Sequence, residues 1–265
     1  MARQPEGPPP PPVVQRLRVR YAKRGPLRFT SHRDFARAFE RALRRAEVPM
    51  AYSAGFSPHP KISYAGAAPT GVASEAEYLE IGLAKACDPE AIRARLDAAL
   101  PPGLDVVDVV EAEPPGLAER LEASQWRIVL PDVSPDEARG AVATLLAADS
   151  APVQRLTKDG TRTVDARAVV LAIDVAEPGV SVDDEPGAAA SCAILDLVMR
   201  HATPAVRPDD VLTALRQTSD LSTPVTPMVT RLAQGLLDEA SPTGPSGHPR
   251  LIDPLRRDGT TTPPR

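Results

Sequence analysis

Hydrophobic and polar residues alternate over residues 15–21, as in a half-buried β-strand. The period then changes to that of a helix. Ser31 is a suitable N-cap, Asp34 is a suitable partner in the first turn, and Pro49 forces an end. The apolar positions of this helix share one face, formed by Phe35, Phe39, Ala42, Leu43 and Ala46. A strand followed by an amphipathic helix is therefore expected.

The same kinds of segment recur along the rest of the chain. In the first half we expect two strands, a helix and a strand at residues 61–65, 75–83, 89–100 and 104–110. In the second half we expect strands and helices at residues 126–130, 134–148, 153–157, 163–175, 208–217 and 225–232. Residues 191–200 fit a strand or a short helix equally well. The predicted fold class is α+β, with two tandem ferredoxin-like units of order β-α-β-β-α-β.

Composition divides the chain into four expected parts. Residues 1–13 are a Pro-rich leader, and residues 238–265 are a tail rich in Pro, Gly, Ser and Thr; both are expected to be disordered. Between them we expect a basic ferredoxin-like unit at 14–113 and a second, acidic unit at 123–237.

The sequence also indicates a compartment and excludes several classes of protein. No apolar run approaches the ~18 residues of a membrane span, and the first residues lack the apolar core of a secretory signal. Cys87 and Cys192 are far apart and form no disulfide framework, so the expected location is the cytoplasm. We find no zinc spacing, Walker motif or iron–sulfur triad, and expect no metal and no cofactor.

The formal net charge of −4 conceals a division along the chain. Residues 13–64 contain twelve basic and three acidic residues, whereas residues 65–265 carry an excess of thirteen negative charges. Every Phe and every Tyr lies between Tyr21 and Tyr78. The first part of the chain therefore has the composition of a surface that binds polyanions.

Arginines of the predicted helix at 31–48 follow helical spacing. Arg33, Arg37, Arg41 and Arg44 are separated by four, four and three residues, which places them on one ridge opposite the phenylalanines. Arg45 and the arginines of the first strand could extend this patch. The alternative is an ordinary solvated helix face on which Glu40 pairs locally. As phosphate-binding residues we predict Arg28, Arg33, Arg37, Arg41, Arg44 and Lys61.

An irregular loop follows this helix, fixed by Gly55, Pro58 and Pro60. It displays aromatic, hydroxyl and imidazole groups on Tyr52, Ser53, Phe56 and His59. Single-stranded RNA is bound by aromatic groups that stack on bases and cations that contact phosphates. Alternatively, Tyr52 and Phe56 fill the core and His59 has no role.

Two histidines are candidate catalytic residues. His32 follows the N-cap, and together with His59 it could in principle support acid–base cleavage of RNA. Alternatively, His32 only bonds the backbone at the helix start. In the second unit Lys158, Asp165 and Arg167 stand out in an acidic region. Asp165 and Arg167 lie two apart on a predicted strand, where they would share a face and form a structural ion pair.

Residues 31–34 (Ser-His-Arg-Asp) and 51–63 (Ala-Tyr-Ser-Ala-Gly-Phe-Ser-Pro-His-Pro-Lys-Ile-Ser) closely resemble a known bacterial family. This is the radical SAM-linked protein family, of the domain-of-unknown-function 2344 type, and the resemblance covers about residues 14–236. It implies a radical SAM protein as partner, on another chain. It supplies no established activity.

These observations together predict an accessory protein without catalytic activity of its own. We expect it to bind RNA, or another polyanion, through its basic first unit and to act with a radical SAM partner in RNA modification. One alternative is an RNA endonuclease or hydrolase that uses His32 and His59. The other is a protein-interaction module that binds no nucleic acid.

Overall fold

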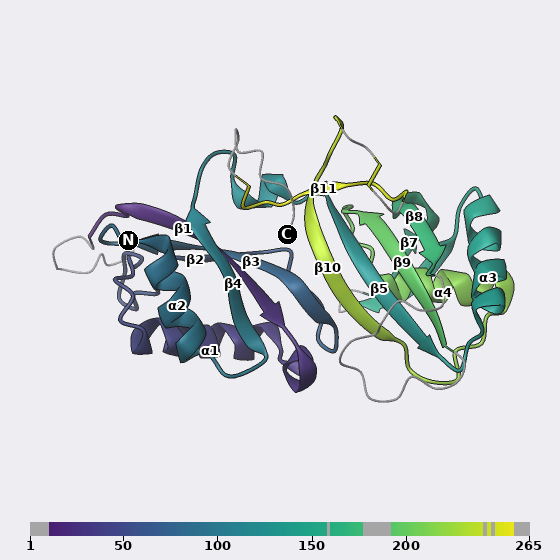
Figure 1. Ribbon diagram of the computed structural model, residues 1–265, viewed down its shortest axis with the longest axis horizontal. Helices are drawn as coiled ribbons and strands as arrows, with labels where there is room; N and C mark the ends of the chain where they lie inside the picture. The colour runs from purple at the N-terminus through teal and green to yellow at the C-terminus, as the bar shows by residue number, and fades with distance from the viewer. Residues whose placement is uncertain (1–10, 158–159, 177–191, 241–242, 245–246, 257–265) are drawn as a thin grey trace. The chain divides into compact units, whose positions relative to one another are not determined.

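The computed structural model describes residues 11–157, 160–176, 192–240, 243–244 and 247–256 of the chain (Figure 1). The chain divides into two compact units, Met1–Arg120 with Asp253–Arg265, and Leu121–Ile252. Sheets and four α-helices are found among the described residues, which confirms the predicted α+β class. Residues 1–10 of the expected leader and residues 177–191, directly before Cys192, lie outside the described residues.

The first unit has the predicted order of elements. These are β1 (Gln15–Lys23), α1 (His32–Arg45), β2 (Ile62–Ala65), β3 (Ala73–Leu83), α2 (Pro89–Ala99) and β4 (Leu104–Glu111). β1 pairs with β3 on one side and β4 on the other, and β2 pairs with β3, all antiparallel. The strand order is therefore β4-β1-β3-β2. Short 3-10 helices lie at Gly25–Phe29 and Leu117–Arg120.

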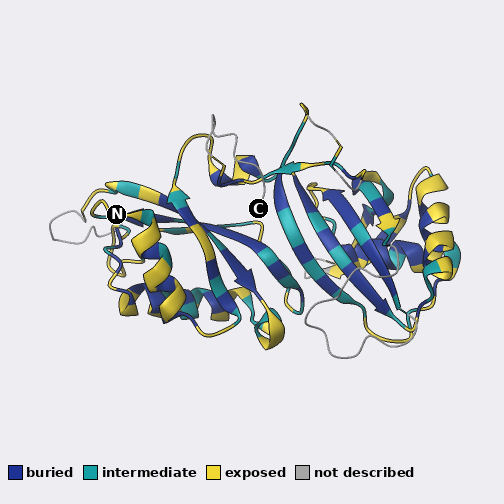
Figure 2. Ribbon diagram, in the orientation of Figure 1, coloured by how far each residue is buried: buried dark blue, intermediate teal, exposed yellow. Residues whose placement is uncertain are grey.

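Helices α1 and α2 lie together on one face of this sheet (Figure 1). Alternation along β1 turns Leu17, Val19 and Tyr21 toward the helices, where they join Phe35 and Phe39 in the core. The rings of Tyr21 and Phe35 stack with centroids 4.3 Å apart. Because the apolar face of α1 is buried in this way, its opposite face is left to solvent (Figure 2).

Local chemistry explains where the two helices begin. The Ser31 hydroxyl accepts a hydrogen bond from the backbone N–H of Asp34 at 3.2 Å and donates to the Asp34 carboxylate at 2.7 Å. Asp88 caps α2 by accepting from the N–H groups of Glu90 and Ala91, and Pro89 occupies the first turn. Both caps bind backbone N–H groups that no helical carbonyl can reach.

The second unit has a sheet of strand order β10-β5-β9-β8 and a separate hairpin of β6 and β7. Helices α3 and α4 pack against each other. The bounds are β5 (Ala123–Pro131), α3 (Pro135–Ala147), β6 (Pro152–Thr157), β7 (Gly160–Asp165), β8 (Val170–Val175), β9 (Cys192–Arg200), α4 (Pro208–Ser219) and β10 (Met228–Leu237). Residues 192–200, which the sequence left undecided, are therefore a strand.

The prediction of a single strand at 163–175 is wrong. The chain leaves the hairpin after Asp165, makes a 3-10 turn at Arg167–Val169, and then enters β8. The Asp165 carboxylate causes this break, since it accepts hydrogen bonds from the N–H groups of Ala151, Arg167 and Ala168.

The expected disorder of residues 238–265 is wrong for part of that segment. Strand β11 (Leu251–Ile252) pairs with the end of β10, and the side chain of Leu255 is buried. Gly235 permits this pairing, because a Cβ atom there would lie 1.9 Å from the backbone oxygen of Ile252. Two paired residues are too few to give a recognisable alternation in the sequence.

Candidate functional site

Four arginines form a continuous exposed ridge along the outer face of α1. We call Arg33, Arg37, Arg41 and Arg44 the arginine ridge. In the part of the chain that the structure describes, none of the four forms an ion pair. Nor does Glu40 form, among these described residues, the local ion pair of the alternative interpretation. The ridge therefore presents four positive charges that the first unit itself does not neutralise.

The arginines of β1 do not extend this ridge, contrary to the sequence interpretation. Alternation places them on the sheet face opposite α1, and each has a carboxylate partner. Arg16 and Arg18 share Glu80 at 3.6 and 3.4 Å, and Arg20 pairs with Asp253 at 3.1 Å. Arg24, the first residue after β1, binds Glu75 and Asp105. These cations are engaged in holding the fold together.

The first unit as a whole is also less basic than its first 64 residues. Residues 65–120 contain eleven acidic residues and four basic ones. Three of these acidic residues pair with arginines near the start of the unit: Glu80 with Arg16 and Arg18, and Glu75 and Asp105 with Arg24. The positive charge that remains unpaired is thus concentrated on α1.

The loop after α1 is a closed hairpin whose base is tied to β3. The N–H of Ala51 donates to the carbonyl of Gly82 and the N–H of Lys61 donates to the carbonyl of Ala51, at 2.8 and 2.9 Å. Further out, the N–H of Ser53 donates to the carbonyl of His59, and the Ser53 hydroxyl accepts from the His59 N–H. The role of Ser53 here is therefore to close the loop.

The aromatic residues of this loop are exposed. Phe56 has 72 % of its surface accessible and Tyr52 has 38 %, so the alternative that they fill the core is wrong. Gly55 has φ +127°, a backbone conformation that side-chain-bearing residues rarely adopt, and it presents Phe56 at the tip. Lys61 and Pro58 are exposed as well.

A cavity of about 140 Å³ lies between the C-terminal half of α1 and this loop. Its apolar walls are Leu43, Val48, Met50, Pro58 and Pro60. Its polar lining is Glu40, Arg44, Tyr52 and His59. The cavity therefore brings together one ridge arginine and four loop residues that the sequence singled out. It adds Glu40, which the sequence treated only as a local ion-pair partner.

The structure places His32 and His59 beside different turns of α1. His32 is exposed at the first turn, where its ring meets Tyr64 edge-on with centroids 4.7 Å apart. His59 lines the cavity with Glu40, eight residues further along the helix, a rise of about 12 Å. A cleavage mechanism in which both imidazoles act on one phosphate gains no geometric support from this arrangement.

Tyr64 was missed by the sequence analysis. Its hydroxyl is buried and has no hydrogen-bond partner among the described residues. Burial together with the nearby charge of Glu40 raises the pKa of Tyr64 to about 12. Its ring also contacts Phe35. Tyr64 therefore supports the exposed His32 from the core side.

Phe29, two residues before the N-cap Ser31, is also exposed, with 62 % of its surface accessible. The guanidinium of Arg28 lies 5.1 Å from the centre of its ring, and Gly71 leaves room beside it. Exposed aromatic rings thus lie near both ends of the ridge. Only its exposure distinguishes Phe29 from the core phenylalanines Phe35 and Phe39.

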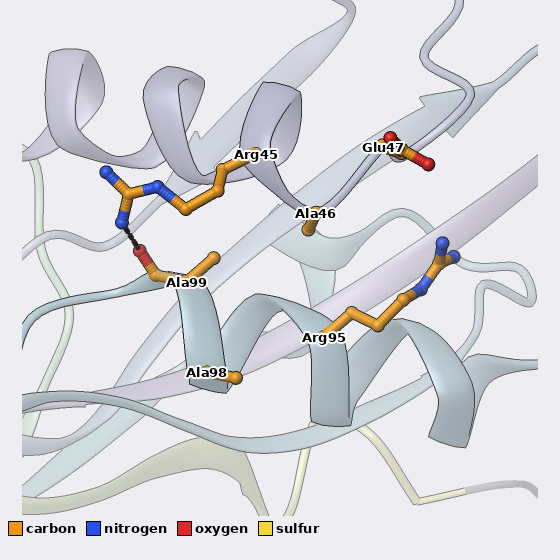
Figure 3. A pocket seen from close by; sticks show the side chains of 6 residues that line it. All are labelled: Arg45, Ala46, Glu47, Arg95, Ala98 and Ala99. Atoms are coloured by element: carbon orange, nitrogen blue, oxygen red, sulfur yellow. Dashed lines mark hydrogen bonds between the residues drawn. The ribbon is translucent and has the colours of Figure 1, made fainter.

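A second, more open hollow of about 300 Å³ lies where the ends of α1 and α2 meet (Figure 3). The side chains of Arg45 and Arg95 extend away from each other there, and Arg45 donates to the carbonyl of Ala99 at 2.9 Å. Glu47 also lines the hollow. Because its cations do not converge, this hollow is a poorer anion site than the ridge.

The second unit does not reproduce such a surface at the residues predicted from sequence. Lys158 lies outside the described residues. The expected ion pair between Asp165 and Arg167 is wrong, because the Asp165 carboxylate binds backbone N–H groups and Arg167 donates to the carbonyl of Val170. Both residues shape the turn between β7 and β8.

The described residues contain no cluster of three His, Cys, Asp or Glu side chains able to hold a metal ion. None of their helices is long and apolar enough to cross a membrane.

Fold and site together define an α+β protein whose first unit carries an unpaired arginine ridge beside an aromatic loop. The chain belongs to the family described as "Uncharacterized protein conserved in bacteria (DUF2344)", whose model matches residues 16–208. This confirms the resemblance to the domain-of-unknown-function 2344 family.

No curated protein matches the chain. Among solved structures, the "Crystal Structure of an Unknown Protein from Galdieria sulphuraria" matches with 14% sequence identity, covering 84% of this chain and 99% of that chain, at a TM-score of 0.24.

Proposed function

We propose that the first unit binds single-stranded RNA through the arginine ridge and the loop of residues 51–61. One observation carries this proposal: the ridge arginines are exposed and unpaired among the described residues, whereas the arginines of β1 are bound to carboxylates. Exposed guanidinium groups in a row bind phosphates and release their counterions.

Exposed aromatic rings favour RNA over an acidic protein as the ligand. Three aromatic residues lie close to the ridge in sequence, namely Phe29, Tyr52 and Phe56. Each exposes more than a third of its surface. Single-stranded nucleic acid offers bases that stack on such rings, at about 1–3 kcal/mol per base. An acidic protein surface would leave these rings without a matching partner.

The family resemblance adds a partner to this proposal. We infer that the protein presents bound RNA to a radical SAM protein on another chain, which would modify it. Support comes from the Ser-His-x-Asp and Gly-Phe-x-Pro-His-Pro motifs, both of which lie beside the ridge in the first unit. The protein itself would act as an accessory binder.

We also infer that both units have the ferredoxin-like fold. In each unit the first strand of the sequence lies between the fourth and the third, as the orders β4-β1-β3-β2 and β10-β5-β9-β8 record. The hairpin β6–β7 is then an insertion in the second unit. This correspondence supports a duplication that residue-level similarity does not reveal.

A salt series tests RNA binding directly. Fluorescence anisotropy of a labelled single-stranded RNA twelve-mer is measured with the full chain between 50 and 300 mM KCl. Four phosphate contacts predict that log K falls with log[salt] with a slope of about −3, at roughly −0.7 per contact. Absence of binding at 50 mM KCl, or binding that is insensitive to salt, contradicts the proposal.

A further inference from the structure

The cavity between α1 and the loop has the size of one aromatic ring. Its volume is about 140 Å³. An apolar protein cavity of about 150 Å³ accommodates benzene. A six-membered pyrimidine base therefore fits, whereas the two fused rings of a purine exceed the space. Apolar residues Leu43, Val48 and Met50 line part of the wall, as a site for a planar base requires.

The polar groups of the cavity are unpaired and complementary. Glu40 and Arg44 are four residues apart on α1, the spacing and order that best suit a helical ion pair. Nevertheless they form no ion pair in the described structure, and both line the cavity. A carboxylate acceptor and a guanidinium donor thus remain free for a ligand in the same small space.

We propose that this cavity binds one pyrimidine base of the RNA, and cytosine in preference to uracil; this inference rests on the proposed function. The Glu40 carboxylate accepts a hydrogen bond from the exocyclic amine of cytosine, where uracil presents a carbonyl oxygen instead. Arg44 donates to the remaining base carbonyl. The other ridge arginines hold the backbone without reading sequence, so the cavity supplies the specificity.

The test compares homopolymers and a pair of matched variants. Binding of C12, U12 and A12 RNA to the full chain is measured by anisotropy at the same salt concentration. The wild type is expected to bind C12 about tenfold more tightly than U12, within the range of one good base contact, and more tightly than A12, whose bases exceed the cavity. Glu40→Gln removes the charge in the cavity, whereas Glu47→Gln makes the same change at an exposed position outside it.

The expected result is that Glu40→Gln lowers the ratio of C12 to U12 affinity below about threefold while Glu47→Gln leaves it unchanged. Equal affinity of the wild type for C12 and U12, with the salt dependence intact, overturns the base site and leaves the proposed RNA binding standing. An unchanged ratio in Glu40→Gln overturns it as well. Absence of binding to any homopolymer at 50 mM KCl overturns both proposals. Circular dichroism melting curves confirm that each variant is folded.

Discussion

The hydroxyl of Tyr64 is buried and has no hydrogen-bond partner in the part of the chain that the structure describes, which is unusual for a phenol in a folded protein. Desolvation of such a group costs about 1–3 kcal/mol. The environment also resists ionisation, since burial and the charge of Glu40 raise the pKa of Tyr64 to about 12. Tyr64 therefore makes its ring contacts with His32 and Phe35 while its buried polar group stays unsatisfied.

We predict that Tyr64→Phe keeps or increases stability, by up to about 1 kcal/mol, because it removes the unsatisfied hydroxyl and keeps the ring. The folded pKa lies above the unfolded value of 10, so the unfolded chain releases its proton first as the pH rises. The wild type should therefore lose stability between pH 10 and 12 relative to the variant. Urea unfolding at pH 8 and pH 11 measures both effects.

Tyr52→Phe is the control, because its side chain is exposed and the change should stay within about 0.5 kcal/mol. A loss of more than about 1 kcal/mol in Tyr64→Phe at pH 8 would show that the hydroxyl has a stabilising partner after all.

At the scale of elements, patterns confined to a short stretch of sequence predicted the helix and its cap correctly. The apolar face of α1 and its Ser31 cap were readable because all the groups involved lie within one helix. The sequence could not show which arginines remain unpaired, since Arg18 pairs with Glu80, a residue 62 positions away in the chain. The cavity was hidden for the same reason: Glu40 joins His59 only once the loop folds back onto α1.

Strand β11 is an element whose pairing depends on a single glycine, Gly235. We predict that Gly235→Ala detaches β11, because the new Cβ would lie 1.9 Å from the backbone oxygen of Ile252 and backbone cannot move aside cheaply. Amide hydrogen exchange should show lost protection at Asp238, whose N–H donates to the carbonyl of Arg250. The expected loss of stability is about 1–3 kcal/mol.

Gly140→Ala provides the matched control for this substitution. Gly140 lies within α3 with no neighbouring atom within 4 Å of an added Cβ, so stability should rise by about 0.5–1 kcal/mol. Unchanged exchange at Asp238 in Gly235→Ala would mean that the β11 pairing tolerates the added methyl group.

At the scale of the whole molecule, net charge and local charge make opposite predictions. A chain of net charge −4 should repel polyanions, and its acidic residues outnumber its basic ones by 35 to 31. Screening limits that repulsion to about 8 Å at physiological salt, so an RNA strand on α1 senses mainly the charges next to it. Position of the arginines, more than their number, should therefore decide binding.

Two double variants of equal net charge separate these predictions. Arg37→Gln with Arg41→Gln removes two ridge cations, whereas Arg93→Gln with Arg95→Gln removes two from α2, where Arg93 pairs with Glu90 at 2.7 Å. We expect the ridge pair to reduce the steepness of the salt dependence by about 1.4, at roughly 0.7 per lost phosphate contact, and the α2 pair to leave it unchanged. Anisotropy titrations over the same salt series measure both slopes. If the two double variants weaken binding equally, the RNA responds to overall charge and the ridge is not the binding surface.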